Sequence, residues 1–394
     1  MWGLSAGHGV KHFCQSAWLI LMPEVRTALS LSDVAVGGIF TAQQVASGVT
    51  NIPAGILTDM FRRRVALMLT LSMLSVAAGY VLIGASNAYW MVLVAGAVMS
   101  TGASWWHSPA IASLVSKYPE KRGLAVAMHL TGAQAGDTIS PLVVGVLLGG
   151  ISLWAIEWSG LDWRTVAFLV VIPAAMTAVT VMALMGRGGA DEKKLSLRQY
   201  LTNSAKLAKN KRVLGMTAVH ALRGGAHSAF VVFLVLYMED VLGYGEKAQG
   251  AHIALLTVAG IASTPLMGRL SDRIGRRPVI VTAMGIGTVL LISFLWADGG
   301  WGMALMLGLL GTVLFAVMPI IAASAMDATE KGSEGTSTAV LFAGGSVVGA
   351  LAPLAAGGIN TEWGFHGVVW MAAGLSLAGA ALAYVIRTPA RVRA

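Results

Sequence analysis

Two apolar stretches of the chain carry basic side chains at helical spacing. In the first, His8, Lys11 and His12 are followed one turn later by Gln15, which places all four on one helix face. A charge inside an apolar stretch is costly and normally serves a function. The stripe therefore predicts an anion-binding surface. In the alternative, Lys11 extends from the early part of its helix to an aqueous interface.

The second stripe comprises His220, Arg223 and His227. Arg223 lies about ten residues inside its apolar stretch, so it must pair with an acid, a carbonyl group, water or a substrate. The planar guanidinium can bind a carboxylate or phosphate through two hydrogen bonds. For the two histidines, a purely structural hydrogen bond and a part in binding are both open. The two stripes together predict an anion held by cationic groups from both parts of the chain.

One acid, Asp137, also lies inside an apolar stretch. It fits two roles: a carboxyl group that loads and releases a proton, or a fixed counter-ion to Lys11. His129 is a second candidate for proton coupling, because histidine changes charge near neutral pH. Gln44 and His107, on other apolar stretches, are candidates for hydrogen bonds to a substrate.

A metal site is not expected from these residues. His8 and His12 have the i, i+4 spacing that suits two metal ligands, but the sequence indicates no third ligand for them. Walker loops and nucleophile elbows are also missing from the sequence, so we expect neither a cofactor nor enzymatic activity.

The composition indicates that the elements carrying these residues are membrane helices. The chain has 394 residues, of which 56% are hydrophobic and 11% charged, and its mean hydropathy is +0.74. Soluble domains are nearer to ~45–50% apolar and ~25% charged. This excludes an ordinary soluble enzyme, a disordered chain and a nucleic-acid-binding module, despite the net charge of +9.

Twelve stretches are apolar and long enough to cross a membrane, which takes ~20 residues. They lie at about 4–27, 34–57, 65–86, 89–115, 122–150, 163–186, 213–238, 247–269, 277–297, 302–326, 335–359 and 366–387. The polar segment 187–212 separates two six-helix bundles, 1–186 and 213–394. Lysine and arginine concentrate in the segments that are cytoplasmic if both termini are cytoplasmic, which predicts that orientation.

The two bundles resemble each other in sequence. His8 and Lys11 return as His220 and Arg223, and the segment from Gly55 returns at Gly268. A nearly constant offset of this kind indicates a duplicated six-helix unit. The repeated loop residues, which a gating motif would use, are Gly55, Asp59 and Arg63 in the first copy, and Gly268, Asp272, Arg273 and Arg276 in the second.

This loop pattern, together with twelve spans, resembles the major facilitator superfamily, whose motif G-x-x-x-D-R-x-G-R-R is complete in the second copy. The first copy departs from it, with Met60 and Arg62 at the usual Arg and Gly positions. Short matches around His8 and His107 and from Arg122 to Pro141 are closest to the fosmidomycin-resistance-like branch. The position of Asp137 is one where that branch is expected to have a small residue.

The resemblance implies an all-α membrane protein that transports by alternating access, in which the motif's acid and arginines latch the cytoplasmic side. We expect proton-coupled export of a small organic anion, or of an amphiphile or drug with an anionic head, across a bacterial inner membrane. Proton-coupled uptake of an organic anion and a receptor or assembly partner without transport are the alternatives. The expected partners are the small molecule, protons and the lipid bilayer; the chain is expected to be a monomer without a nucleic-acid partner.

Overall fold

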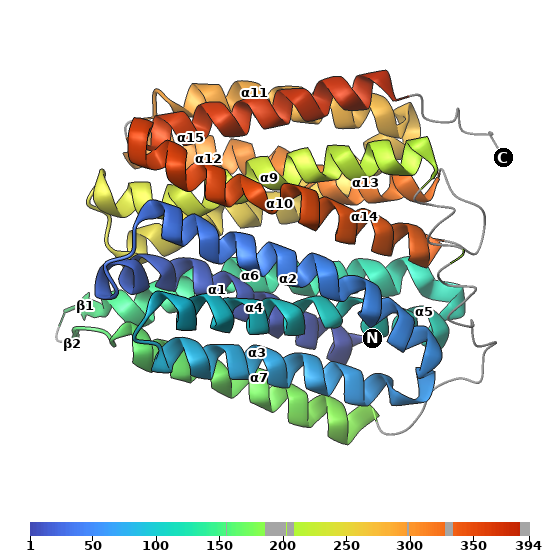
Figure 1. Cartoon of the computed structure of the whole chain (residues 1–394), viewed down its shortest axis with the longest axis horizontal. Coiled ribbons are helices and arrows are strands. Elements are labelled where there is room, and N and C mark those ends of the chain that lie inside the picture. Colours follow the sequence, from blue (N-terminus) through green and yellow to red (C-terminus); the bar gives the residue numbers. More distant parts are fainter. Residues whose placement is uncertain (155, 186–201, 203–208, 298, 328–333, 387–394) are drawn as a thin grey trace. The chain divides into compact units, whose positions relative to one another are not determined.

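The computed structural model describes residues 1–154, 156–185, 202, 209–297, 299–327 and 334–386, and these are almost entirely helical (Figure 1). The helices are α1 (Trp2–Ala28), α2 (Asp33–Met60), α3 (Val65–Ala85), α4 (Tyr89–Trp105), α5 (His107–Lys117), α6 (Arg122–Gly149), α7 (Trp163–Met185), α9 (Lys211–Asp240), α10 (Glu246–Ile274), α11 (Arg276–Phe294), α12 (Gly300–Leu314), α13 (Val317–Met326), α14 (Glu334–Gly349) and α15 (Leu351–Val385). Short 3-10 turns lie at Arg62–Arg64 and Pro119–Lys121. The all-helical prediction is confirmed, with one small addition: strands β1 (Ile151–Leu153) and β2 (Ile156–Trp158) form an antiparallel hairpin.

Each of the predicted spans falls on helix, but three of them are broken in the middle, of which the eleventh is described below. The fourth consists of α4 and α5, which meet at Trp106, and the tenth consists of α12 and α13, which meet at Ala316. In both cases a proline, Pro109 or Pro319, follows three residues after the break. Proline disturbs the helical turn that precedes it. The recurrence of the break in both halves agrees with the duplication.

The last two predicted spans, 335–359 and 366–387, differ from the structure inside the first of them, because α14 ends at Gly349 and α15 begins at Leu351. The turn between the two spans is a kink inside α15 at Gly364, where φ is +62°. Glycine adopts positive φ without a steric penalty, so the chain reverses there with few residues outside helix. This reversal lies within the gap that the sequence pattern predicts between the two spans.

Seven helical segments among the described residues are long and apolar enough to cross a membrane. α1 and α6 are not among them, because polar side chains lower their hydropathy. The predicted linker 187–212 lies mostly outside the described residues. By its contacts the chain divides into unit 1 (residues 1–195 and 235–254) and unit 2 (residues 196–234 and 255–394).

In unit 1 the closest helix pairs are α1 with α6, α3 with α7, α3 with α4, and α2 with α4. The core between them includes Trp18, Tyr80 and Trp106, which are almost fully buried. The Tyr80 hydroxyl donates a hydrogen bond to the Cys14 carbonyl, which joins α3 to α1. These contacts fix α1 at the centre of the polar groups described below.

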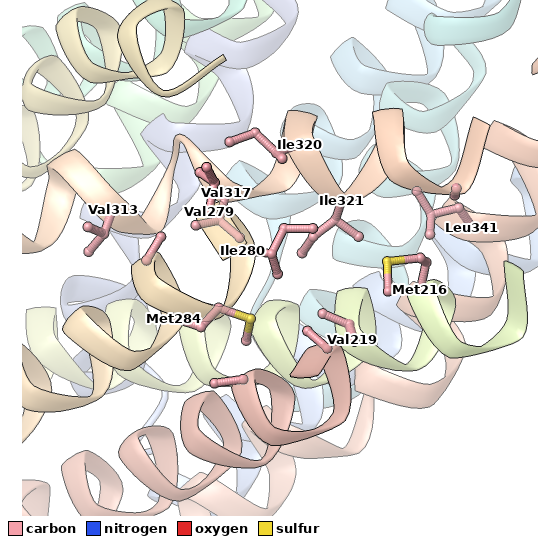
Figure 2. Close-up of a cluster of buried hydrophobic side chains, with 14 residues drawn as sticks. Met216, Val219, Val279, Ile280, Met284, Val313, Val317, Ile320, Ile321 and Leu341 are labelled. Atoms are coloured by element: carbon pink, nitrogen blue, oxygen red, sulfur yellow. The ribbon is translucent and has the colours of Figure 1, made fainter. Parts of the chain in front are cut away.

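In unit 2, α11 packs on α15, α12 and α13. Figure 2 shows the apolar cluster that holds these helices together, which includes Ile280 and Met284 of α11, Val317 and Ile321 of α13, and Val219 of α9. Each of these side chains is at most 3% exposed. Aliphatic and methionine side chains fill this core, so the polar residues of α9 are held on an apolar scaffold.

Candidate functional site

Two glycines of α6 bring α1 and α6 into direct backbone contact. A Cβ atom at Gly132 would lie 2.1 Å from the Ser5 carbonyl oxygen, and one at Gly136 would lie 2.0 Å from the Gly9 carbonyl oxygen. No residue larger than glycine fits at such distances. Small residues allow membrane helices to approach closely in this way. The polar side chains that follow these glycines therefore meet those of the α1 stripe.

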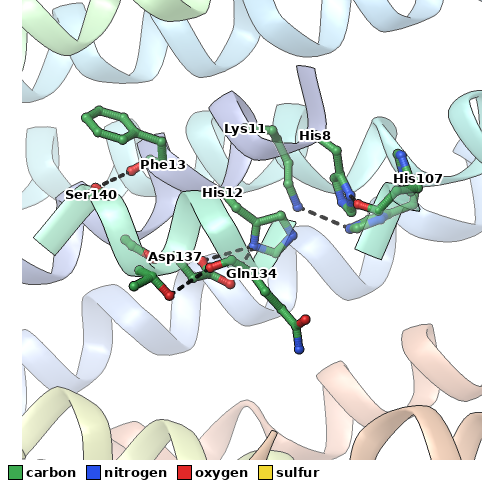
Figure 3. A network of polar contacts seen from close by, with 11 residues as sticks. His8, Lys11, His12, Phe13, His107, Gln134, Asp137 and Ser140 are labelled. Atoms are coloured by element: carbon green, nitrogen blue, oxygen red, sulfur yellow. Dashed lines mark hydrogen bonds and ion pairs between the residues drawn. The ribbon is translucent and has the colours of Figure 1, made fainter. Parts of the chain in front are cut away.

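Asp137 of α6 is bound by two side chains of α1. His12 Nδ1 lies 3.1 Å from one carboxylate oxygen of Asp137 and 3.0 Å from the other, and the Ser16 hydroxyl donates a bond of 2.7 Å (Figure 3). Because a carboxylate accepts hydrogen bonds, Nδ1 of His12 carries the proton. Ser140, three residues after Asp137 on α6, donates to the Phe13 carbonyl at 2.6 Å.

His107 reaches α1 from the start of α5. Its Nε2 atom lies 3.2 Å from the Lys11 ammonium nitrogen, which donates the hydrogen bond. The position of α5 follows from Trp106, whose ring is fully buried against Gly7: a Cβ there would lie 2.6 Å from the ring. The helix break at Trp106 thus turns His107 toward Lys11.

His8 precedes Lys11 by three residues on α1 and contacts α6. Its Nδ1 donates a 2.8 Å hydrogen bond to the carbonyl oxygen of His129, and the two imidazole rings are stacked with centroids 3.8 Å apart. Both side chains are buried, with 1% and 0% exposure. The His8 ring also meets the rings of His12 and His107 edge-on, at centroid distances of 4.7 and 5.1 Å.

These residues form one group, which we call the polar cluster. It consists of His8, Lys11, His12, His107, His129 and Asp137. His8, Lys11 and His129 are buried, whereas the side chains of His12 and Asp137 are 22% and 19% exposed. The cluster therefore has a partly exposed side, formed by His12 and Asp137, and a buried side that carries a lysine. The cluster offers N–H donors that can bind an anion. It also contains a carboxylate, that of Asp137, which is held by hydrogen bonds from His12 and Ser16.

The structure overturns the reason for expecting no metal ligands. One ring nitrogen from each of His8, His12 and His107 lies within 4.8 Å of the other two. The third imidazole is almost one hundred residues from the first two in sequence, and the packing of α5 on α2, α3 and α6 brings it there.

Two predicted site residues are not part of the polar cluster. Gln15 and Gln44 are half-buried on α1 and α2, and among the described residues no hydrogen bond joins either to the cluster. Ser16 was not predicted, although it binds Asp137 directly. The signal was available, because Ser16 lies one helical turn after His12 on the same stripe.

In unit 2 the three side chains of the second stripe lie on α9, and each has a different environment. The Arg223 guanidinium donates to the Leu314 carbonyl, with Nε at 3.1 Å. The His220 ring packs edge-on against Phe342 at 5.4 Å, and the His227 ring against Phe315 at 5.1 Å. Of the partners expected for Arg223, the structure thus gives a carbonyl group. Whether this stripe and that of α1 share a ligand stays a prediction.

Comparison with known proteins decides the family. The sequence pattern of the Major Facilitator Superfamily matches residues 4–336 and 216–394. The chain belongs to the major facilitator superfamily. It is therefore a multi-pass membrane protein of a transporter family.

Similar superfamily members include the Fosmidomycin resistance protein of Escherichia coli (strain K12), 24% identical over 283 residues that cover 70% of this chain and 66% of that protein. The match thus spans slightly less than two thirds of the relative's length. Multidrug resistance protein MdtG of Salmonella paratyphi C (strain RKS4594) is 23% identical over 345 residues, 86% of this chain and 82% of the relative. A bacterial homolog of the human lysosomal transporter Spinster, inward-facing and unoccupied, shares the fold, with a TM-score of 0.77, 16% identity, and coverage of 97% and 95%.

The structure gives the side-chain contacts of the superfamily loop motif in its second copy. Arg276, at the start of α11, contacts Asp272 of α10 at 2.7 Å and Asp327, just after α13, at 3.3 Å. It also donates to the Ser271 hydroxyl at 2.6 Å. These bonds tie three helix ends of unit 2 together. Gly268 and Arg273 lie on α10 in the same motif.

In the first copy, Gly55 lies in α2 and Arg63 lies in the 3-10 turn that follows it. The side chain of Asp59 lies outside the described residues. The latch that the motif predicts on the cytoplasmic side stays a prediction.

Proposed function

We propose that this superfamily member is a secondary active transporter that exports a small organic anion, or an amphiphile or drug with an anionic head, in exchange for protons. The observation that carries the proposal is the polar cluster, which brings together a buried lysine, four imidazoles and a single carboxylate. Export is supported by the resistance proteins among the relatives, whose names concern fosmidomycin and multiple drugs.

The charges of the cluster favour an anion over a cation. Lys11 and Asp137 together are neutral, and each histidine that binds a proton adds a positive charge. Lys11 is 1% exposed and, within the described part of the chain, its hydrogen-bond partner is His107, a neutral acceptor. A buried ammonium group is strongly attracted to an anion, because little water screens the interaction. His8, His12 and His107 line the same surface and add hydrogen bonds.

Proton coupling is assigned to Asp137, with His129 as a second carrier. The Asp137 carboxylate is partly buried and contacts His12, so a proton added to either group changes the charge next to Lys11. Binding of the anion and of protons are then linked, because both alter the same electrostatic balance. A fixed counter-ion role for Asp137 is the competing proposal, and the double variant described in the Discussion separates the two.

The second half contributes to the same function in our proposal. Arg223, with His220 and His227, supplies further substrate contacts, and Gln15, Gln44 and the loop acids Asp59 and Asp272 keep their predicted roles in binding and gating. The repeat in sequence supports this, since Arg223 occupies the position equivalent to Lys11. Transport follows from alternate opening of the two sides of the membrane. We place both termini in the cytoplasm, with the protein acting as a monomer in a bacterial inner membrane.

The proposal is tested by flux measurements in proteoliposomes that contain the full chain. The probes are fosmidomycin, a panel of organic carboxylates and phosphonates, and a cationic dye. The expected result is anion movement driven by an imposed pH gradient and lost in Lys11→Gln. The matched control is Ser140→Ala, on the same helix pair but without a contact to the cluster. Binding without flux would instead indicate a receptor, flux of the dye alone would refute the anion assignment, and co-directional movement with protons would indicate uptake.

A further inference from the structure

We propose that His8, His12 and His107 form a binding site for a divalent transition-metal ion of the zinc class. One ring nitrogen from each residue lies within 4.8 Å of the other two. The three rings come from two helices: His8 and His12 are one turn apart on α1, and His107 begins α5. The same three histidines line the proposed anion-binding surface, but metal binding by them does not depend on which substrate is transported.

The hydrogen bond of His8 uses its Nδ1 atom and leaves Nε2 available to bind a metal. Nδ1 of His8 faces the carbonyl oxygen of His129 at 2.8 Å, so it carries the proton. Nε2 therefore bears a lone pair, and this buried atom has no hydrogen-bond partner among the described residues. A buried polar atom without a partner costs free energy. A metal ion would satisfy it.

The same arrangement holds at His12. Its Nδ1 donates to the Asp137 carboxylate at 3.0–3.1 Å, which again leaves the lone pair on Nε2. Histidines that bind metals almost always donate their other N–H to a carboxylate or a backbone carbonyl, which orients the ring and increases its basicity. His12 has the carboxylate and His8 has the carbonyl.

His107 is the third proposed metal ligand. Its Nε2 accepts a hydrogen bond from the Lys11 ammonium at 3.2 Å, so the lone pair is on the side that faces α1. A metal ion bound there takes the place of this hydrogen bond. Lys11 then competes with the metal, because its positive charge occupies the same lone pair and repels a second cation.

The distances suit the proposed ion after small side-chain movements. Zinc binds imidazole nitrogen at ~2.0–2.1 Å in tetrahedral geometry, which requires nitrogens about 3.4 Å apart. His12 and His107 are half-buried, while His8 is stacked on His129, so the adjustment falls on the two half-buried rings. Three imidazoles favour zinc, cobalt, nickel or copper over magnesium or calcium, which prefer oxygen ligands. Water would supply the fourth ligand.

The test uses the purified full chain in detergent, prepared with an affinity tag that contains no histidine. Zn²⁺ affinity is measured by calorimetry, and added Co²⁺ is followed by its visible absorption, which reports tetrahedral nitrogen ligation. We expect one bound ion per chain. We also expect at least about tenfold weaker binding in His107→Gln and in His12→Gln, and about 10–100-fold weaker binding in Asp137→Asn, which removes the carboxylate behind His12.

Two further variants make the test specific: a control that should leave metal binding unchanged and a variant that should strengthen it. His220→Gln removes the histidine at the position equivalent to His8, which packs on Phe342, and it should leave metal affinity unchanged. Lys11→Met should strengthen metal binding, whereas loss of Lys11 weakens anion binding in the function proposed above. The proposal is overturned if wild-type protein shows no tetrahedral Co²⁺ spectrum with Co²⁺ in excess. It is also overturned if His107→Gln and His220→Gln bind zinc equally.

Discussion

Replacing Asp137 by asparagine tests how the charges of the polar cluster are balanced. The substitution keeps the size of the side chain and one acceptor oxygen but removes the negative charge that His12 and Ser16 bind. It also leaves Lys11, which is 1% exposed, without the nearby carboxylate that attracts it electrostatically. Both effects lower the stability of the folded protein.

The expected loss follows from the two hydrogen bonds. Bonds to a charged group contribute about 1.5–3 kcal/mol each and neutral ones nearer 1 kcal/mol, so changing the acceptor from charged to neutral costs about 2 kcal/mol in total. Because one kcal/mol shifts the unfolding temperature of a domain of this size by about 2–4 °C, we expect a decrease of about 4–8 °C. A fluorescence thermal-unfolding assay of the purified protein measures it.

The double variant Asp137→Asn with Lys11→Gln distinguishes the two proposed roles of the acid. A counter-ion role predicts that removing both charges recovers at least half of the lost stability, since a buried charge is no longer left unpaired. A proton-carrier role predicts that dependence of flux on the pH gradient is lost in Asp137→Asn and is not restored in the double variant. Ser140→Ala should show no energetic coupling to Lys11→Gln. Strictly additive losses in the double variant would refute the electrostatic pairing of Lys11 and Asp137.

Two further predictions concern the scaffold around the site. Gly136→Ala should destabilise the protein by about 1–3 kcal/mol and reduce transport, because its methyl group would collide with the Gly9 carbonyl; Gly285→Ala, which has open space, is the control in the same thermal-unfolding assay. Asp162→Ala should cost about 1 kcal/mol at neutral pH, because Asp162 accepts hydrogen bonds at the start of α7. The Thr165 hydroxyl bond lowers the pKa of Asp162, so this stabilisation is present above the ordinary carboxyl pKa and is lost as the pH falls through the lowered value. Wild type and Asp162→Ala should therefore have the same unfolding temperature at low pH. A difference that persists at low pH would contradict the role of Asp162 as the N-terminal cap of α7.

The helices of this fold were predictable because each buries an apolar surface over a length set by the membrane. The same pattern missed the breaks at Trp106 and Ala316, since backbone geometry in the middle of an apolar stretch leaves hydropathy unchanged. It also missed the break between α14 and α15 at Ala350, although it placed the gap between the last two spans around Gly364, where a single positive φ replaces a loop. Such details depend on local backbone conformation, which composition does not report.

The candidate site was predictable only within single helices. Helical periodicity placed His8, Lys11 and His12 on one face, and the structure confirms that they lie together. The positions of His107 and His129 beside them depend on how α6 packs on α1 and how α5 packs on α2 and α6, which periodicity cannot give. For this reason the sequence indicated two imidazoles at metal spacing and the structure supplies a third.

The central claim is that the polar cluster binds an organic anion through Lys11. The most direct measurement is the dissociation constant of the anion with the highest affinity in the carboxylate and phosphonate panel, determined for wild type, Lys11→Gln and the control Ser140→Ala. The account predicts at least about tenfold weaker binding in Lys11→Gln, equivalent to about 1.4 kcal/mol, and unchanged binding in the control. Equal affinity of wild type and Lys11→Gln, in variants that unfold at similar temperatures, would contradict it.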